Sequence, residues 1–259
     1  MTQGELSGRT AVVTGGSRGV GRAVALALAH KGAAVAVNYR RDQDSAADVV
    51  AQIIAAGGTA RAYQAEIGDA AKIQAMVEEI RHDLGPIDIV ISNAGISSRG
   101  HDVADTPHTE FESLMKVHTW GPIQLIQALL PDLRQAERGD IVMISSAAVA
   151  TAPAGAAAYT MAKAAMETCV ATLAREERRN GIRANIVAPG LVSTDMGRRL
   201  VNAAAGHDIQ DLNSSAPFGR VCTPDDVAGA VNWLVSSDAS YVSGQKIGVD
   251  GGGPEASVF

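Results

Sequence analysis

The sequence predicts an α/β fold in which one domain is built on a doubly wound parallel sheet of about seven strands. Short β-rich runs alternate along the chain with longer Ala-rich runs of helical periodicity. The strand runs are apolar at consecutive positions, as expected for a sheet covered by helices on both faces. No repeat or linker interrupts this order over 259 residues, a length that an α/β sheet often fills as one domain. Residues 1–259 are therefore expected to form a single domain.

The elements follow one another in a regular strand-helix order. Runs rich in Val and Ile predict strands at residues 10–14, 33–39, 60–66, 87–93, 140–146, 182–190 and 246–250. Ala-rich runs of helical period predict helices at residues 19–32, 45–58, 71–85, 109–135, 156–179 and 224–235. Strands joined by helical crossovers are parallel, and we expect the strand order 3-2-1-4-5-6-7.

Residues 192–217 break the alternation where another crossover helix is due. The segment carries Gly197 and Gly206 among polar residues. It also contains Met196, Leu200, Val201, Ile209 and Leu212. Two interpretations remain open: a mobile lid, at about residues 193–217, over a partly apolar ligand, or a surface loop with a short helix.

Composition excludes several classes of function. Lys and Arg total 22 against 28 Asp and Glu, a formal net charge of -6, and no basic block suggests a nucleic-acid partner. Cys169 and Cys222 form neither a CxxC pair nor a disulfide framework, so we expect reduced thiols and no metal site. The polar start MTQGELSGRT and the absence of an 18-residue apolar run predict a cytoplasmic protein without a membrane partner.

A glycine-rich turn directly follows the first predicted strand and opens the first helix. Its residues are Thr14, Gly15, Gly16, Ser17, Arg18, Gly19, Val20 and Gly21. Backbone N–H groups at a helix start favour a pyrophosphate, and glycines let the ligand approach the backbone. Arg22 and Val24 stand where two standard phosphate-binding patterns require Lys and Gly. The position of the turn predicts a nucleotide site; a turn of purely structural role is the alternative.

The end of the second strand predicts which dinucleotide binds. An acidic residue at this place usually holds the ribose hydroxyls of the adenosine, but here the residue is Tyr39. Arg40 and Arg41 follow it, and together with Arg18 they offer cationic donors for a 2'-phosphate. The pattern favours NADP(H) over NAD(H), unless the arginines form only a solvated surface cluster.

Ser146, Tyr159 and Lys163 are the candidate proton-transfer residues. Tyr159 and Lys163 are four positions apart and share one face of a predicted helix. A neighbouring ammonium group lowers the pKa of a tyrosine, so we expect Lys163 to lower that of Tyr159. Ser146 ends the strand at residues 140–146, at the sheet edge where open α/β folds bind ligands. Taken alone, the Tyr-Lys spacing also fits an ordinary surface pair.

Taken together, these motifs resemble the short-chain dehydrogenase/reductase family, close in pattern to its 3-oxoacyl-(acyl-carrier-protein) reductases. The resemblance covers residues 6–252. Its further motifs are Asn93-Ala94-Gly95, Pro189-Gly190 with Thr194, and Val249-Asp250-Gly251-Gly252. It implies a Rossmann-type fold, a homotetramer joined through the helices at residues 109–135 and 156–179, and NADPH as the hydride donor.

The resemblance also implies roles for further residues. Asn93, Ala94 and Gly95 would line the adenine side, and Lys163 would also hold the nicotinamide ribose. Residues 189–194, including Pro189, Gly190, Val192 and Thr194, would contact the carboxamide. Glu66 and Ile67 would lie beside the adenine, where the family often has aspartate in place of Glu66.

One departure falls within the expected catalytic site. The family has an asparagine, which helps to hold a water in the proton relay, where this chain has His118. Imidazole can also donate and accept hydrogen bonds, so His118 is expected either to replace the asparagine or to weaken turnover. Pro122, four residues later, predicts a helix kink at the His118 carbonyl.

The sequence therefore predicts an NADPH-dependent oxidoreductase that reduces a ketone, such as a carrier-bound 3-oxoacyl thioester, with Tyr159 as general acid. Two alternatives remain. One is a tailoring ketoreductase or an alcohol or sugar dehydrogenase of secondary metabolism. The other is a regulatory protein that binds NADP but has lost turnover.

Overall fold

Seven parallel strands form one sheet in the computed structural model, which describes residues 4–253. The strands are β1 (Thr10–Val13), β2 (Ala34–Tyr39), β3 (Thr59–Gln64), β4 (Ile89–Ser92), β5 (Gly139–Ile144), β6 (Ile182–Pro189) and β7 (Lys246–Val249). Their order is β3-β2-β1-β4-β5-β6-β7, and every neighbouring pair is parallel. The predicted doubly wound sheet and its strand order are confirmed.

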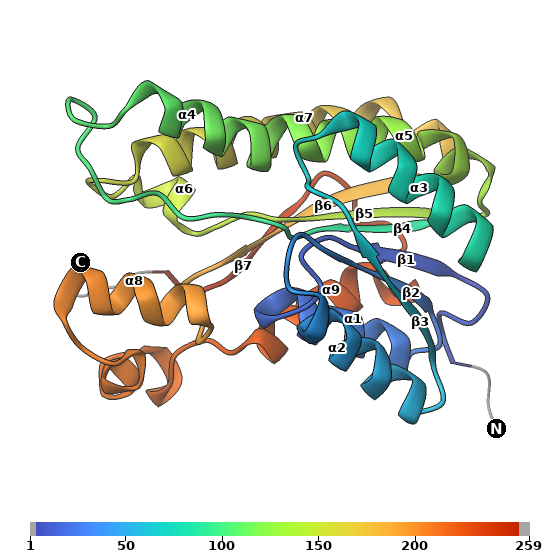
Figure 1. Ribbon diagram of the computed structural model, residues 1–259, viewed down its shortest axis with the longest axis horizontal. Coiled ribbons are helices and arrows are strands. Elements are labelled where there is room, and N and C mark those ends of the chain that lie inside the picture. The colour runs from blue at the N-terminus through green and yellow to red at the C-terminus, as the bar shows by residue number, and fades with distance from the viewer. Residues whose placement is uncertain (1–3, 254–259) are drawn as a thin grey trace.

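Helices cover both faces of the sheet (Figure 1). One face carries α1 (Gly19–His30), α2 (Gln43–Ala55) and α9 (Pro224–Leu234); the other carries α3 (Ala70–Leu84), α4 (His108–Met115), α5 (Gly121–Gln135) and α7 (Ala157–Glu176). Side chains of β1 alternate between two cores: Ala11 and Val13 join the core under α1, whereas Val12 joins the core under α3 and α5. Two apolar layers therefore hold the sheet rigid beneath its loops.

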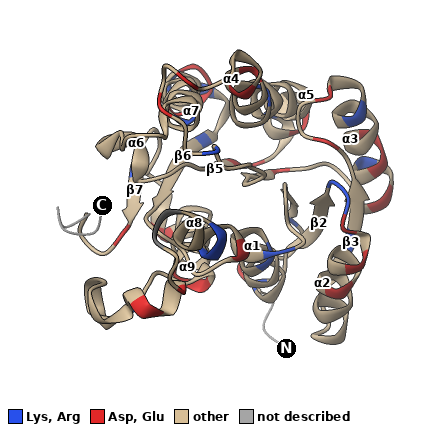
Figure 2. Ribbon diagram, turned by 60° about the vertical axis from the view of Figure 1, so that its left-hand side comes forward, with Lys and Arg blue, Asp and Glu red and all other residues tan. Residues whose placement is uncertain are grey.

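Charged side chains lie mainly on the outer helices, with both signs on α3 (Figure 2). Some charged side chains are nevertheless buried, among them that of Asp140 in β5, which is 1% exposed. It pairs with Arg9 at 2.8 Å, with Arg183 at 2.6 Å and with Arg138 at 3.1 Å. This cluster lies at the amino end of β5, opposite the edge where the predicted site residues follow their strands.

The helix predicted at residues 109–135 is interrupted by a π-helical turn, Lys116–Trp120, between α4 and α5. The Gly121 N–H donates to the Lys116 carbonyl, five residues back. Pro122 has no N–H for the carbonyl of His118, so the α-helical bonding pattern cannot continue through this point. The irregularity expected at His118 is therefore present, in the form of a π turn.

The segment at residues 192–217, where the sequence breaks the strand-helix alternation, contains a regular helix. α8 (Asp195–Ala205) begins at Thr194, whose Oγ1 accepts a hydrogen bond from the Gly197 N–H at 3.1 Å. Short 3₁₀ turns follow at Ile209–Ser214 and Pro217–Gly219. Of the remaining short elements, α6 (Ala148–Thr151) precedes α7, and 3₁₀ turns occupy Arg178–Asn180 and Ser237–Ala239.

Within residues 4–253, no helix has both the length and the apolar character needed to cross a membrane.

Candidate active site

The predicted site residues gather at the carboxyl edge of the sheet, where the strand order reverses between β1 and β4. Thr14 directly follows β1, and its Oγ1 accepts hydrogen bonds from the N–H groups of Asn93 and Ala94, at 2.9 and 3.0 Å. In return, Asn93 Nδ2 donates to the carbonyls of Thr14 and Gly15, at 2.9 and 3.2 Å. The two predicted motifs thus lock one another in place.

Glycines shape the turn after β1. A Cβ on Gly21 would clash with the Gly15 carbonyl and the Asn93 side-chain nitrogen. Gly19 has a φ of +53°, and a Cβ there would lie 3.2 Å from Thr194 Cγ2. Only glycine fits both constraints without strain. The same contact brings Thr194, from the start of α8, to the glycine turn.

The N-terminus of α1 is open to an anion. Arg18 occupies the N-cap position without a side-chain cap, and the first turn contains no acidic residue. The first backbone N–H groups of a helix have no partner inside the helix, and the helix dipole favours negative charge there. The turn therefore fits the pyrophosphate of a dinucleotide.

Basic side chains surround the end of β2. Arg18, Arg40 and Arg41 are exposed, and none of the three forms a salt bridge within residues 4–253. The pKa of Asp42 is lowered, first by hydrogen bonds from Ser45 and then by the Arg18 charge, which places Arg18 near this strand end. Tyr39, by contrast, is only 8% exposed and packs in the core under α1.

Asn38 is a positioning residue that the sequence did not single out. Its side-chain oxygen accepts from the Gly15 N–H at 3.2 Å. Its side-chain nitrogen donates to the carbonyls of Tyr63 and Ala65, at 3.3 and 3.1 Å. Asn38 therefore ties the glycine turn to β2 and to the end of β3. A buried polar residue inside an otherwise apolar strand was the available signal.

Ser146, Tyr159 and Lys163 come together between β5 and α7. Lys163 is buried, and its Nζ donates to the Ile144 carbonyl at 2.6 Å. Burial lowers the pKa of Lys163 to about 8, and the charge of Glu167 acts in the opposite direction. The Glu167 carboxylate accepts from Ser145 Oγ at 2.5 Å and pairs with Lys246 at 2.9 Å.

The net pKa of Tyr159 is raised, not lowered as expected. Burial raises the pKa of Tyr159, and only the hydroxyl of Ser146 counteracts it. Lys163 Nζ lies 5.8 Å from the centroid of the tyrosine ring and is hydrogen-bonded to Ile144. Tyr159 is therefore held as a protonated phenol, which suits a proton donor.

His118 lies in the π turn and contacts this group. Its side chain is 2% exposed, and its ring meets that of Tyr159 edge to face, with centroids 5.3 Å apart. Nε2 lies 2.7 Å from the Ile96 carbonyl oxygen. Burial, followed by the nearby charge of Lys163, lowers the pKa of His118 to about 3. His118 is therefore a neutral imidazole at physiological pH.

The residues predicted to border the nicotinamide lie at the end of β6 and in the loop that follows it. A Cβ on Gly190 would touch Asp250, and Val192 bridges to Cys222. Pro189 ends β6.

Ile67 is buried in the core under α3, and Glu66 is half-buried. Ser17 is buried, and Val20 packs against the core under α1.

Segment 193–217 contributes to a small apolar cluster that also includes Val221. Val201 and Ile209 pack with Val221, and Leu212 lies against them. Met196 and Leu200, one helical turn apart on α8, remain exposed. Packing accounts for part of the apolar character of the segment, and the exposed pair leaves an apolar surface free.

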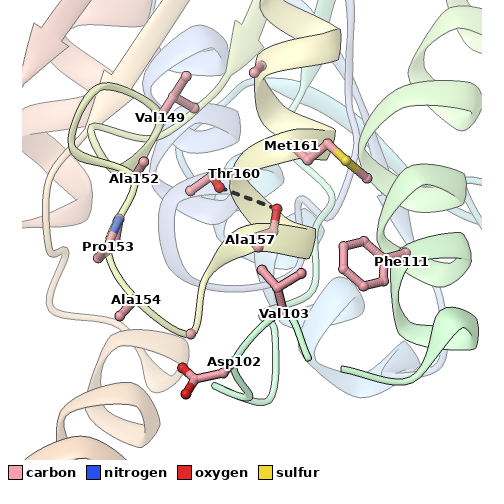
Figure 3. Close-up of a pocket in the computed structure, with 12 residues that line it drawn as sticks. Asp102, Val103, Phe111, Val149, Ala152, Pro153, Ala154, Ala157, Thr160 and Met161 are labelled. Atoms are coloured by element: carbon pink, nitrogen blue, oxygen red, sulfur yellow. Dashed lines mark hydrogen bonds between the residues drawn. The ribbon is translucent and has the colours of Figure 1, made fainter. Parts of the chain in front are cut away.

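A cavity of about 770 Å³ lies on another side of α7 (Figure 3). Ala157, Met161 and Ala164 line it from α7, and Phe111 lines it from α4. These α7 positions lie on the helix face opposite Tyr159 and Lys163. Ser146, Tyr159 and Lys163 do not line this cavity, although Thr160 and part of the segment between Ser146 and Tyr159 do.

Comparisons with known proteins cover nearly the whole chain. The sequence family described as enoyl-(acyl carrier protein) reductase matches residues 15–253. Versicolorin reductase 1 of Aspergillus parasiticus is 38% identical over 95% of this chain and 97% of its own. A 3-oxoacyl-(acyl-carrier-protein) reductase of Staphylococcus aureus is 34% identical over 94% and 97%. The structure of an angucycline C-6 ketoreductase with bound NADP matches with a TM-score of 0.87, 31% identity and 96% coverage of both chains.

Proposed function

The chain belongs to the short-chain dehydrogenase/reductase family, and on that basis we propose that it is an NADPH-dependent ketoreductase. The observation that carries the proposal is the placement of Ser146, Tyr159 and Lys163 at the sheet edge that also carries the open glycine turn. A nucleotide at the turn and a proton donor at the same edge are the two parts that carbonyl reduction requires.

NADP(H) is the cofactor that the charges favour. The N–H groups at the start of α1 would hold the pyrophosphate, and Arg18, Arg40 and Arg41 would surround the 2'-phosphate. The angucycline ketoreductase, which binds NADP, supports this assignment. We further propose that Asn93 to Gly95, Glu66 and Ile67 border the adenine, and that residues 189–194 border the nicotinamide.

Each catalytic side chain has one task in the proposed reduction. When bound, NADPH supplies the hydride that the carbonyl carbon receives. Ser146 donates a hydrogen bond to the carbonyl oxygen, and Tyr159 delivers its phenolic proton to that oxygen as the alcohol forms. Lys163 then stabilises the phenolate until a proton from solvent restores the phenol.

The substrate is proposed to be a ketone with a partly apolar body. The exposed Met196 and Leu200 of α8 support contact with such a body. Residues 193–217 would then act as a lid. Versicolorin reductase and the angucycline ketoreductase support a bulky ketone of a tailoring pathway as a second candidate beside a carrier-bound 3-oxoacyl thioester.

The proposed assembly is a homotetramer in the cytoplasm. Two exposed side chains support a contact between copies. Met161 lines the cavity of Figure 3, and Trp120 lies in the π turn. The free thiols of Cys169 and Cys222 support a reducing compartment. Light scattering should give a tetramer for the native chain and a smaller species for Met161→Arg; a native monomer would contradict the assembly.

The function is tested by NADPH oxidation with 3-oxoacyl thioesters, simple ketones and bulky aromatic ketones. We expect turnover with at least one class, and a loss of about 10²- to 10⁴-fold in Tyr159→Phe with unchanged NADPH affinity. Equal activity of the two proteins would contradict the role of Tyr159. Tight NADPH binding without turnover on any ketone or alcohol would instead favour a regulatory protein.

A further inference from the structure

Glu167 lies on α7 one helical turn after Lys163, outside the group of residues that the reduction uses. Its side chain is only 15% exposed. Oε1 accepts a hydrogen bond from Ser145 Oγ at 2.5 Å, and Oε2 pairs with Lys246 Nζ at 2.9 Å. Ser145 directly follows β5, and Lys246 is the first residue of β7. Both oxygens of this carboxylate are therefore held by residues of the sheet and its edge.

Two successive turns of α7 hold the strand end that carries Ser146. Lys163 Nζ donates to the Ile144 carbonyl at 2.6 Å. The next residue, Ser145, donates to Glu167. Lys163 and Glu167 are four residues apart, so they share one face of the helix. Ser146 follows directly in the chain, so its position relative to the proton donor of α7 depends on both contacts.

Glu167 also acts as a charge on Lys163. Burial lowers the pKa of Lys163 to about 8, and the charge of Glu167 acts in the opposite direction. The other titratable groups that face this ammonium group are the Tyr159 phenol and the His118 imidazole, both uncharged at neutral pH. Lys246 faces Glu167 from β7, and its ammonium group competes for the same carboxylate. Within residues 4–253, Glu167 is thus the only anion that favours the charged form of Lys163.

We propose that Glu167 is a positioning residue with two tasks: it is the counter-ion of the Lys163 ammonium, and through the hydroxyl of Ser145 it orients the end of β5. Lys246 limits the first task because it draws the carboxylate toward β7. Glu167 acts through these neighbours and not on the reacting atoms. The inference rests on the proposed function, because both tasks serve the same site.

Four substitutions separate the charge from the hydrogen bond. Glu167→Gln removes the charge and keeps an oxygen that accepts from Ser145. Ser145→Ala removes that hydrogen bond and keeps the charge. Lys246→Met removes the competing ammonium group and leaves Glu167 in place. Glu176→Gln is the matched control, because it removes the same charge from an exposed position at the end of α7.

The pH profile of kcat with an active ketone should report the charge. The proposed reduction needs the charged form of Lys163, whose pKa of about 8 sets the basic limb. In Glu167→Gln we expect this limb to move down by about one pH unit, so that kcat falls about fivefold at pH 8 and hardly at all at pH 6. In Lys246→Met the limb should move up by about half a unit. Glu176→Gln should keep the native profile.

The hydrogen bond should give a different signature. In Ser145→Ala we expect kcat to fall about 3- to 10-fold at every pH, because Ser146 is less well oriented, while the basic limb stays in place. A native basic limb in Glu167→Gln, or a loss of kcat that is equal at low and high pH, would overturn the role of its charge. A native kcat in Ser145→Ala would overturn the orienting role. Neither result would affect the proposed function.

A titration without cofactor or turnover completes the test. The chain has five lysines, and in ¹H–¹³C spectra of protein labelled at lysine Cε the resonance missing in Lys163→Met belongs to Lys163. Its midpoint should lie at about pH 8 in the native protein, about one unit lower in Glu167→Gln and unchanged in Glu176→Gln. Equal midpoints in all three proteins would overturn the inference. Because this titration needs no substrate, it remains decisive even if no ketone is turned over, the outcome that would refute the function itself.

Discussion

The rings of His118 and Tyr159 meet edge to face, with their planes at 84° and their centroids 5.3 Å apart. The contact joins the π turn before α5 to the first turns of α7, two segments 41 positions apart in the chain. Edge-to-face aromatic contacts have a preferred geometry, so the π turn helps to position the tyrosine, together with the cluster of Leu114, Ala158 and Ala162. A change at residue 118 therefore acts on the proton donor as well as on the backbone of Ile96.

Gly21→Ala should abolish tight NADPH binding. The added Cβ would meet the carbonyl of Gly15 and the side chain of Asn93, so the turn must open. We expect the Kd for NADPH, measured by fluorescence titration, to rise at least about tenfold, together with a lower Tm. Gly229→Ala is the matched control, because Gly229 lies within α9 and a Cβ added there would meet nothing within 4 Å. It should leave the Kd unchanged and stabilise the protein by about 0.5–1 kcal/mol. An unaltered Kd in Gly21→Ala would show that the turn does not hold the cofactor.

Replacing Arg40 and Arg41 by alanine should remove the preference for NADPH over NADH. Each charge-assisted bond to the 2'-phosphate contributes about 1.5–3 kcal/mol, so KM for NADPH should rise at least about tenfold while that for NADH stays constant. Arg22→Ala also removes a guanidinium charge, but that guanidinium is bound to Gln52. It should leave both constants unchanged. Equal losses for the two cofactors would exclude a specific phosphate contact.

The buried His118 should make the fold sensitive to acid. Its pKa is about 3 in the folded state and near 6.5 when exposed, so between these values the unfolded chain binds one more proton. The free energy of unfolding therefore falls as pH falls through this window, by about 1.4 kcal/mol per pH unit. From pH 6.5 to pH 5, denaturant titration should show the native protein losing about 2 kcal/mol more than His118→Asn. If the unfolding free energies of the two proteins changed in parallel with pH, the His118 imidazole would take up its proton as readily in the folded state as in the unfolded chain.

Asp140→Asn should destabilise the fold and spare the chemistry. The substitution leaves Arg9 and Arg183 partly buried without their shared carboxylate, a change that costs about 3–5 kcal/mol. Glu112→Gln, in an exposed pair with His108, should change stability by less than about 1 kcal/mol. At a temperature where both variants remain folded, kcat should equal that of the native enzyme. A large loss of kcat in folded Asp140→Asn would show that the ion pairs at the amino edge of the sheet affect catalysis at its carboxyl edge.

Local sequence patterns were sufficient to predict the sheet. Apolar runs such as residues 10–14 alternate with helical periods, and helical crossovers make the strands parallel. The strand order was expected from the usual arrangement of dinucleotide-binding sheets. The glycine turn was equally readable, because Gly19 and Gly21 meet steric demands that no other residue meets.

Features that depend on contacts between distant parts of the chain could not be predicted from the sequence. Pro122 predicted an irregular helix, but the form of the irregularity depends on how Gly121 packs against the loop after β3. The pKa of Tyr159 is set by burial, which four-residue spacing cannot reveal. Asn38 acquires its role only when β2 and β3 pair. For residues 192–217 the sequence left a lid and a short helix open, because the contacts of Val201 and Ile209 with Val221 cannot be inferred from spacing.

Val201, Ile209 and Val221 form an apolar cluster separate from the two main cores. A segment with its own small core can open while the sheet stays folded, at a free-energy cost well below that of global unfolding. Backbone amides of α8 should then exchange hydrogen much faster than those of β5. Val201→Ala should therefore speed exchange in α8 and leave exchange in β5 unchanged.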